Sequence, residues 1–338
     1  MKSPSLTPTG GQTELVEEWR RELPGSKGDV YILGGEDLEM SRIRTRLNRA
    51  GAEVVDIGMR WEQAANEGVG AVAEHINRIK SEGKTPVTIE LAGAGDLRPD
   101  VVEIDHHNER SDRPPSVAQV MERMGLAPVL KDRLVGANDA GYIPAMMEVT
   151  NDILGRLNNR LSAMAGVSEE EKQKRLEGSK RWLDTMIDRV RREDRAAQGV
   201  TEEMEAEAEE ALKHAEVDPE TGTILVRIEG DRCSPVTDRL FSGWPDGRQN
   251  LIVVASSGQD MEEVWFFGRG DQCVEISNHF LAKKAQKEAD GTKEGNEYHS
   301  FSGGAGRGKK EADGMALVVA KDASEVISFI RQIKLEKE

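Results

Sequence analysis

The sequence predicts an α/β protein with a mostly parallel N-terminal sheet, a helical connector and a smaller α/β C-terminal domain. Short apolar runs alternate with helical patterns in the N-terminal half, a long charged helical stretch follows, and strand-like runs then resume. At 338 residues the chain is long enough for two cores. We expect a first domain over residues 1–150, a connector over 151–215 and a second domain over 216–338.

The N-terminal strands are predicted from four short apolar runs, at residues 30–33, 54–57, 87–91 and 101–104. Helical patterns follow the first two runs, over residues 40–50 and 64–79. Runs that are apolar on both faces are typical of parallel strands covered by helices. Ligands of such sheets bind at the carboxyl ends of the strands, so functional side chains are expected there.

The connector and the C-terminal domain are predicted from a change of pattern. Residues 150–215 are helical and highly charged, which indicates solvated helix faces. Arg191, Arg192 and Arg195 could instead contact phosphate, but the pattern does not select them. Strand-like runs and a final amphipathic helix follow, at residues 224–228, 251–255, 264–267, 316–319 and 323–333.

Composition excludes several classes of protein. The formal net charge of -16 argues against a protein that coats nucleic acid without selectivity. A polyanionic substrate would need local compensation from metal ions or a Lys/Arg patch, although the acidity could also be a salt or solubility adaptation. Cys233 and Cys273 lack metal or disulfide spacing, which favours a reducing cytoplasm. We expect neither a signal peptide nor a membrane span.

The clearest chemical motif follows the fourth apolar run. Asp105, His106 and His107 stand where the chain leaves the predicted sheet. Carboxylate beside imidazole is a ligand mixture that suits Mn²⁺ or a similar ion. Two adjacent histidines alone are more often surface or capping residues, so the interpretation depends on the residues that accompany them.

Further acidic residues stand at comparable points of the chain. Asp37 and Glu39 follow the first apolar run, Glu90 ends the third, and Asp139 lies in the segment GANDAGYIPAM. Asp37 or Asp139 could each be a helix N-cap, and Glu90 could be a surface carboxylate. Their joint order nevertheless predicts that strand-end side chains converge on one site.

This order of motifs resembles the DHH phosphoesterase superfamily, which includes RecJ-type exonucleases, nanoRNases, cyclic-dinucleotide phosphodiesterases and family II pyrophosphatases. The resemblance implies two metal ions, Mn²⁺ first, with Co²⁺ or Mg²⁺ as alternatives. It implies the following roles: His106, Asp139 and Glu39 on one ion, Asp37 on the other, Glu90 between them, Asp105 orienting the site or binding metal at its edge, and His107 on the substrate phosphate. The chain departs from the family at Leu33, where a histidine is usual, and at Glu39 and Glu90, which replace Asp.

A second motif lies near the C-terminus, in the sequence FSGGAGRGKK of residues 301–310. It is similar to the glycine-rich loop of the DHHA1 domain, which grips substrate in that family, although the usual histidine is missing. Glycines let backbone N–H groups approach phosphate oxygens, and the cations add positive charge. The residues expected to bind substrate are Gly303, Gly304, Gly306, Arg307 and Lys309. A connector without chemistry is the alternative.

The sequence therefore predicts a metal-dependent phosphoesterase acting on short oligonucleotides or cyclic dinucleotides. One alternative is a pyrophosphatase or another hydrolase of small phosphorylated compounds, against which the glycine-rich loop argues. A second alternative is a non-catalytic nucleotide-binding protein, which Leu33 favours. A homodimer is left open, and no membrane partner is expected.

Overall fold

The structure is a computed structural model that describes residues 28–59, 64, 67–91, 100–107, 110, 113–230, 232–241, 250–256, 261–290, 299–303 and 313–337. The chain divides into two compact units. The first unit comprises Met1–Asp105 and Pro114–Asp132, and the second comprises His106–Arg113 and Arg133–Glu338. The domain boundaries predicted at residues 150 and 215 stay predictions.

The first unit contains the parallel sheet that the apolar runs predict. Its strands are β1 (Asp29–Ile32), β2 (Glu53–Val55), β3 (Thr85–Ile89) and β4 (Val102–Ile104). They pair in the order β2-β1-β3-β4, and every pair is parallel. Strand β2 lies on one side of β1, and strands β3 and β4 lie on the other. The direction in which strands are added therefore reverses after β2, and the topological switch point falls between β1 and β3.

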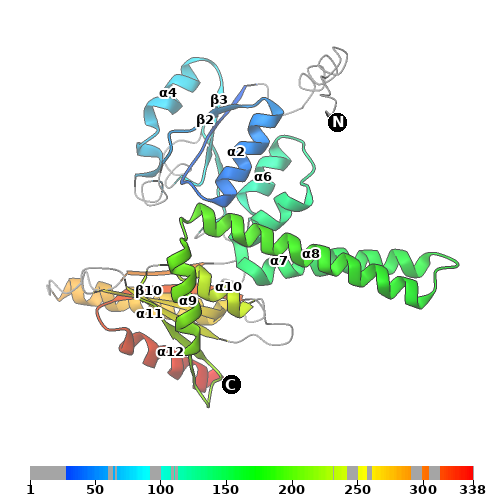
Figure 1. Cartoon of the computed structure of the whole chain (residues 1–338). Helices are drawn as coiled ribbons and strands as arrows, with labels where there is room; N and C mark the ends of the chain where they lie inside the picture. Colours follow the sequence, from blue (N-terminus) through cyan, green and yellow to red (C-terminus); the bar gives the residue numbers. More distant parts are fainter. Residues whose placement is uncertain are drawn as a thin grey trace, which may run out of the picture. The chain divides into compact units, whose positions relative to one another are not determined.

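Helices cover both faces of this sheet (Figure 1), as strands apolar on both faces require. Helices α2 (Leu38–Ala50) and α6 (Ser116–Arg123) contribute to one apolar cluster with the strands. Helix α4 (Ala73–Ser81) contributes to the other, after the short 3₁₀ helix η1 (Gly68–Gly70). The helix predicted over residues 64–79 is therefore interrupted within its described part.

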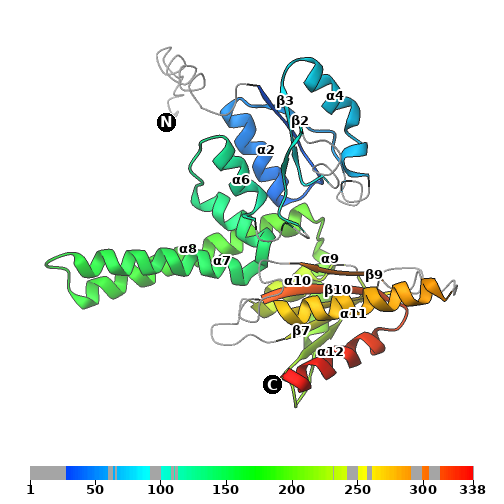
Figure 2. The ribbon, with the colours of Figure 1, turned by 180° about the vertical axis from the view of Figure 1, so that it is seen from behind.

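The second unit contains the helices predicted over residues 150–215, and their role as a connector between domains stays a prediction. Its helices are α7 (Leu130–Ala163), α8 (Glu169–Ala197), α9 (Glu202–Lys213) and α10 (Ser234–Phe241). Helices α7 and α8 lie side by side in both views (Figures 1 and 2). The side chains of Ser168 and Thr201 cap α8 and α9, accepting hydrogen bonds from backbone N–H groups of the first turns.

The second unit also contains a mixed six-stranded sheet in the order β5-β6-β7-β8-β10-β9. Its strands are β5 (Glu216–Val217), β6 (Ile224–Arg227), β7 (Leu251–Ser256), β8 (Glu262–Arg269), β9 (His299–Gly303) and β10 (Asp313–Ala320). Helices α11 (Gly270–Ala289) and α12 (Ala323–Lys337) pack on one face, which Figure 2 shows in front. A mixed α/β fold with a parallel sheet and a second sheet is thus confirmed.

Cys233 and Cys273 are both free thiols, as their spacing predicts. Within the described part of the chain, no helix is both long and apolar enough to cross a membrane.

Candidate metal centre

The carboxyl edge of the parallel sheet carries acidic residues on neighbouring strands. Ile89 of β3 is the register partner of Ile104 of β4, so Glu90 and Asp105 are the next residues along these two strands. The backbone N–H of Glu90 donates to the carbonyl oxygen of Ile104 at 2.9 Å, which extends the ladder by one bond. Asp105 is buried, and its carbonyl oxygen accepts from the amide of Gln119. The register therefore sets Glu90 and Asp105 side by side at this edge.

The backbone at Glu90 is held in an unusual conformation. Glu90 has a φ of 52°, a left-handed value that a residue with a Cβ adopts rarely and at a cost. Gly34 lies against this turn, because a Cβ at Gly34 would be 2.4 Å from the carbonyl oxygen of Ile89 and 2.6 Å from that of Glu90. The segment after β1 and the segment after β3 thus touch through their backbones, at the point where the strand order reverses.

The second unit brings three of the predicted site residues together. His106 is buried, and its Nε2 lies 2.6 Å from Oδ2 of Asp139, which stands in α7. The rings of His106 and His107 are 4.5 Å apart between centroids. One ligand atom from each of His106, His107 and Asp139 lies within 4.8 Å of the others. Two segments 33 residues apart in sequence therefore meet in one cluster.

The donor set of this cluster fits a divalent metal ion. Donor atoms on opposite sides of one ion are about 4 Å apart, because each lies roughly 2.0–2.2 Å from it. The three ligand atoms lie within 4.8 Å of one another, so one ion could be reached from all three after small movements of the side chains. Imidazole nitrogen and carboxylate oxygen are donors that Mn²⁺, Co²⁺ and related ions accept. The cluster is therefore compatible with a divalent metal, without selecting which one.

The two acidic residues after β1 have structural contacts in the first unit. Asp37 is the N-cap of α2, where its Oδ1 accepts from the backbone N–H of Met40 at 2.7 Å. Glu39 is buried, and its Oε1 accepts from the backbone N–H of Val117 at 3.0 Å, at the start of α6. Asp37 is therefore a helix N-cap, which is one of the two interpretations that its position in the sequence allows. Metal ligation by Asp37, Glu39 and Glu90 stays a prediction.

Leu33 stands where the superfamily that the sequence resembles has a histidine, and it belongs to the apolar core. Its side chain is 1% exposed and belongs to the apolar cluster that β1, β3 and α2 form. An apolar side chain in that environment offers no ligand atom. The residue that replaces the family histidine is thus part of the core.

The glycine-rich motif is only partly described by the structure. Gly303 ends strand β9, and this strand pairs with β10 as an edge strand of the second sheet. Gly304, Gly306, Arg307 and Lys309 lie outside the described residues. Their predicted contacts with substrate therefore stay predictions.

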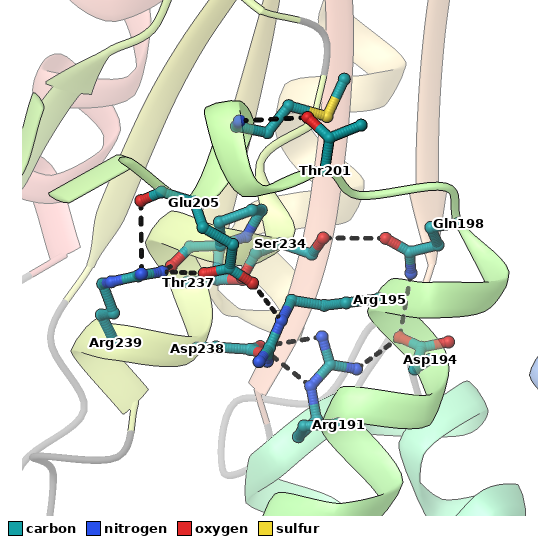
Figure 3. A network of polar contacts seen from close by, with 12 residues as sticks. Arg191, Asp194, Arg195, Gln198, Thr201, Glu205, Ser234, Thr237, Asp238 and Arg239 are labelled. Carbon is teal, nitrogen blue, oxygen red and sulfur yellow. Dashed lines mark hydrogen bonds and ion pairs between the residues drawn. The ribbon is translucent and has the colours of Figure 1, made fainter. Parts of the chain in front are cut away.

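A buried polar network close in sequence to Asp139 was not predicted. Arg191 of α8 is 3% exposed and bonds to Asn138 of α7 and to Asp238 of α10, as Figure 3 shows for Asp238. Arg195 pairs with Glu205 and with Asp238. The ion pairs of Arg191 and Arg195 could not be predicted, because a buried arginine and an exposed one cannot be told apart within a highly charged sequence. Arg192, which the sequence also offered as a possible phosphate contact, is exposed.

Comparisons with known proteins find similarity among solved structures. No model of a known protein family matches the chain, and no curated protein does. Among solved structures, the chain is similar to RecJ from Thermus thermophilus in complex with Mg²⁺, with 16% sequence identity and a TM-score of 0.34. The match covers 98% of this chain and 53% of RecJ, so the chain spans about half the length of that protein.

Proposed function

We propose that the chain is a divalent-metal-dependent hydrolase of phosphodiester bonds in short oligonucleotides or cyclic dinucleotides. The observation that carries the proposal is the cluster of His106, His107 and Asp139, with ligand atoms within 4.8 Å of one another. The resemblance to DHH phosphoesterases implies Mn²⁺ as the ion, with Co²⁺ and Mg²⁺ as alternatives. The resemblance to DHH phosphoesterases supports a phosphate ester as substrate, as an analogy.

The side chains have separate roles in this proposal. His106 and Asp139 would hold the ion, and His107, the third member of the cluster, would donate a hydrogen bond to a phosphate oxygen. Glu90 is a further carboxylate ligand that the resemblance implies, and Asp105 orients the site. A bound divalent ion supplies stabilisation of the charge that develops on the phosphoryl group and lowers the pKa of a water ligand. The protein therefore needs no nucleophilic side chain of its own.

Substrate binding is assigned to the glycine-rich motif. Backbone N–H groups at Gly303, Gly304 and Gly306 would approach phosphate oxygens closely, since no side chain stands in the way. Arg307 and Lys309 would supply positive charge in a chain whose net charge is -16. A motif that reads phosphates in this way suits a phosphodiester with a recognisable end.

A second candidate function is nucleotide binding without turnover. The observation that favours it is Leu33, which lies in the core where the family has a metal-binding histidine. A site that lacks this ligand would hold fewer ions or hold them more weakly, and hydrolysis would suffer before binding does. A pyrophosphatase is less favoured, because the glycine-rich motif argues for a larger substrate.

The first experiment measures Mn²⁺ binding and the rate of phosphodiester hydrolysis on the same proteins. Purified protein is titrated with Mn²⁺ by calorimetry, and hydrolysis of bis(4-nitrophenyl) phosphate is followed for the parent, His106→Ala and His214→Ala. His214 is an exposed histidine at the end of α9 and is the matched control. We expect His106→Ala to lower the rate at least about 100-fold, since even partners of ligands cost 10- to 100-fold. No Mn²⁺ uptake, together with equal rates for parent and His106→Ala, would show that the hydrolase proposal is wrong.

The second experiment separates the two candidate functions. Melting temperatures are measured with Mn²⁺ and a 5′-phosphorylated dinucleotide, a cyclic dinucleotide, pyrophosphate or a nucleoside monophosphate. The substrate class should stabilise the metal-loaded protein most and be cleaved on longer incubation. A dinucleotide that stabilises the protein and stays intact supports the binding protein instead.

A further inference from the structure

Arg191 joins three helices of the second unit through its guanidinium group. Its Nη1 donates to Oδ1 of Asn138 at 2.6 Å and to Oδ2 of Asp194 at 2.5 Å. Its Nε donates to Oδ1 of Asp238 at 2.8 Å (Figure 3). The group is 3% exposed, so loss of one partner would leave a buried charge poorly compensated. Helices α7, α8 and α10 are therefore held at one point.

Tyr142 adds a second set of contacts to this point. Its ring lies under the guanidinium of Arg191, with 3.8 Å between Cζ and the ring centroid. Its hydroxyl donates to Oδ1 of Asp238 at 2.7 Å, lies 2.6 Å from the hydroxyl of Thr237, and accepts from Nη2 of Arg191. Burial raises the pKa of Tyr142 well above its ordinary value, partly offset by the charge of Arg191, so the phenol stays a hydrogen-bond donor.

The backbone at Tyr142 is strained, and the strain interrupts α7. Gly141 and Tyr142 have non-helical dihedral angles within this helix, and Tyr142 has a φ of 62°. Such a conformation persists in a non-glycine residue only where the surrounding contacts impose it. The contacts of the Tyr142 side chain with Arg191 and Asp238 meet this requirement. The break in α7 is thus fixed from the side of α8 and α10.

The break begins two residues beyond Asp139, at Gly141, and Asn138 immediately precedes Asp139 in the chain. Arg191 anchors the residue before Asp139, and Tyr142 anchors the turn after it. The carboxylate of Asp139 in turn lies 2.6 Å from Nε2 of His106. The geometry of the metal cluster therefore depends on a turn whose two flanks are held by one buried network.

We propose that Arg191 and Tyr142 are positioning residues, which fix the turn of α7 that carries Asp139 and so set its carboxylate against His106. Neither residue is assigned a contact with substrate or metal. The consequence for metal binding rests on the function proposed above, whereas the consequence for the contact of Asp139 with His106 does not. The two consequences can be measured separately.

The metal-free test observes His106 directly. Protein labelled with ¹⁵N-histidine is compared for the parent, Tyr142→Phe, Arg191→Met and the control Arg189→Met, and the ring signals of His106 are assigned with His106→Gln. Arg189 is on the same helix, is exposed and pairs with Glu193, so its loss removes a similar charge. We expect the ¹⁵N chemical shifts of the His106 ring to change in Tyr142→Phe and Arg191→Met and to stay the same in Arg189→Met. Unchanged His106 signals in a folded Tyr142→Phe protein would overturn the proposal.

The metal test uses the same variants and Mn²⁺ calorimetry. We expect Tyr142→Phe and Arg191→Met to weaken Mn²⁺ binding about 10-fold, which is the usual loss when a group supporting a ligand is removed, and Arg189→Met to leave it unchanged. A purely structural role would lower the melting temperature of the metal-free variants without changing Mn²⁺ affinity or the His106 signals, and would also overturn the proposal.

Two further outcomes are separable in this design. If Arg191→Met does not fold, Tyr142→Phe decides the matter, because it keeps the ring that stacks on Arg191 and removes one hydroxyl. If the parent itself takes up no Mn²⁺, the proposed function fails, and the His106 signals of the metal-free variants alone support or overturn the positioning role.

Discussion

Nε2 of His106 lies 2.6 Å from Oδ2 of Asp139, although the two residues belong to different segments of the second unit. We expect these side chains to be energetically coupled in the metal-free protein, because each is the other's close polar partner in a largely buried place. A double-mutant cycle with His106→Gln and Asp139→Asn, measured by urea unfolding, should give a coupling of about 0.5–3 kcal/mol. Strictly additive losses of stability would contradict this relationship.

Leu33→His should destabilise the protein without creating a metal ligand. The side chain is 1% exposed among apolar neighbours, so an imidazole there would lose hydration without a designed partner. We expect a loss of about 2–4 kcal/mol in the free energy of unfolding. Leu33→Met keeps the volume and should cost less than about 1.5 kcal/mol. An undiminished urea midpoint with tighter Mn²⁺ binding for Leu33→His would show that this side chain reaches the metal centre.

Gly34→Ala should disturb the carboxyl edge of the parallel sheet. The added Cβ would stand 2.4 Å from the carbonyl oxygen of Ile89, which forces the backbone to move. We expect a loss of about 1–3 kcal/mol by urea unfolding, as for other overpacked sites. The matched control is Gly155→Ala in α7, where a Cβ meets nothing within 4 Å. This control should be neutral or stabilising by up to about 1 kcal/mol, and equal behaviour of both variants would contradict the close approach.

Glu39→Gln separates a structural role from a metal-binding role. The carboxylate of Glu39 accepts from the backbone N–H of Val117 at the start of α6, where the helix dipole favours negative charge. We expect a loss of about 1 kcal/mol in the metal-free protein, measured by urea unfolding. The control Glu36→Gln, at an exposed residue beside α2, should stay within about 0.5 kcal/mol. Unchanged Mn²⁺ affinity in Glu39→Gln would contradict the ligand role that the family resemblance implies.

The raised pKa of Tyr31 predicts that the free energy of unfolding falls at alkaline pH. Burial, and then the charge of Asp29, raise the pKa of Tyr31 to about 12, against an opposing effect of Arg123. The folded protein therefore keeps a proton that the unfolded chain loses above about pH 10. This contribution to stability is complete below about pH 10 and is lost as the pH rises toward 12. Urea unfolding at a series of pH values should show a shallower decline for Tyr31→Phe than for the parent, and identical slopes would refute the shift.

Local patterns in the sequence predicted the strands and helices that carry the candidate site. The apolar runs at residues 30–33, 54–57, 87–91 and 101–104 overlap strands β1 to β4, because strands covered on both faces must be apolar throughout. The position of Glu90 and Asp105 at the carboxyl edge follows from the same runs. Elements with weaker local signals were missed, such as the edge strand β9, which is ordered by its pairing with β10.

The roles of individual polar residues were not available from the sequence. Asp37 and Glu39 read as equal candidates for metal ligation, whereas the structure shows Asp37 capping α2 and Glu39 bonded to the start of α6. Arg191 read as one of several solvated arginines of the connector, whereas it is buried on Tyr142. Burial and partner identity depend on how helices pack, which a charge pattern does not encode.

The sequence by itself determined the α/β class, the helical connector and the place of the Asp105-His106-His107 motif directly after a strand. Only the tertiary structure decided that Asp139 meets His106, that Leu33 belongs to the core and that Arg191 and Tyr142 hold the turn beside Asp139. The physical reason is one of distance along the chain. Backbone preference and hydrophobic periodicity act over a few residues, whereas contacts such as that between Arg191 and Asn138, 53 residues apart, arise only when packed helices bring their side chains together.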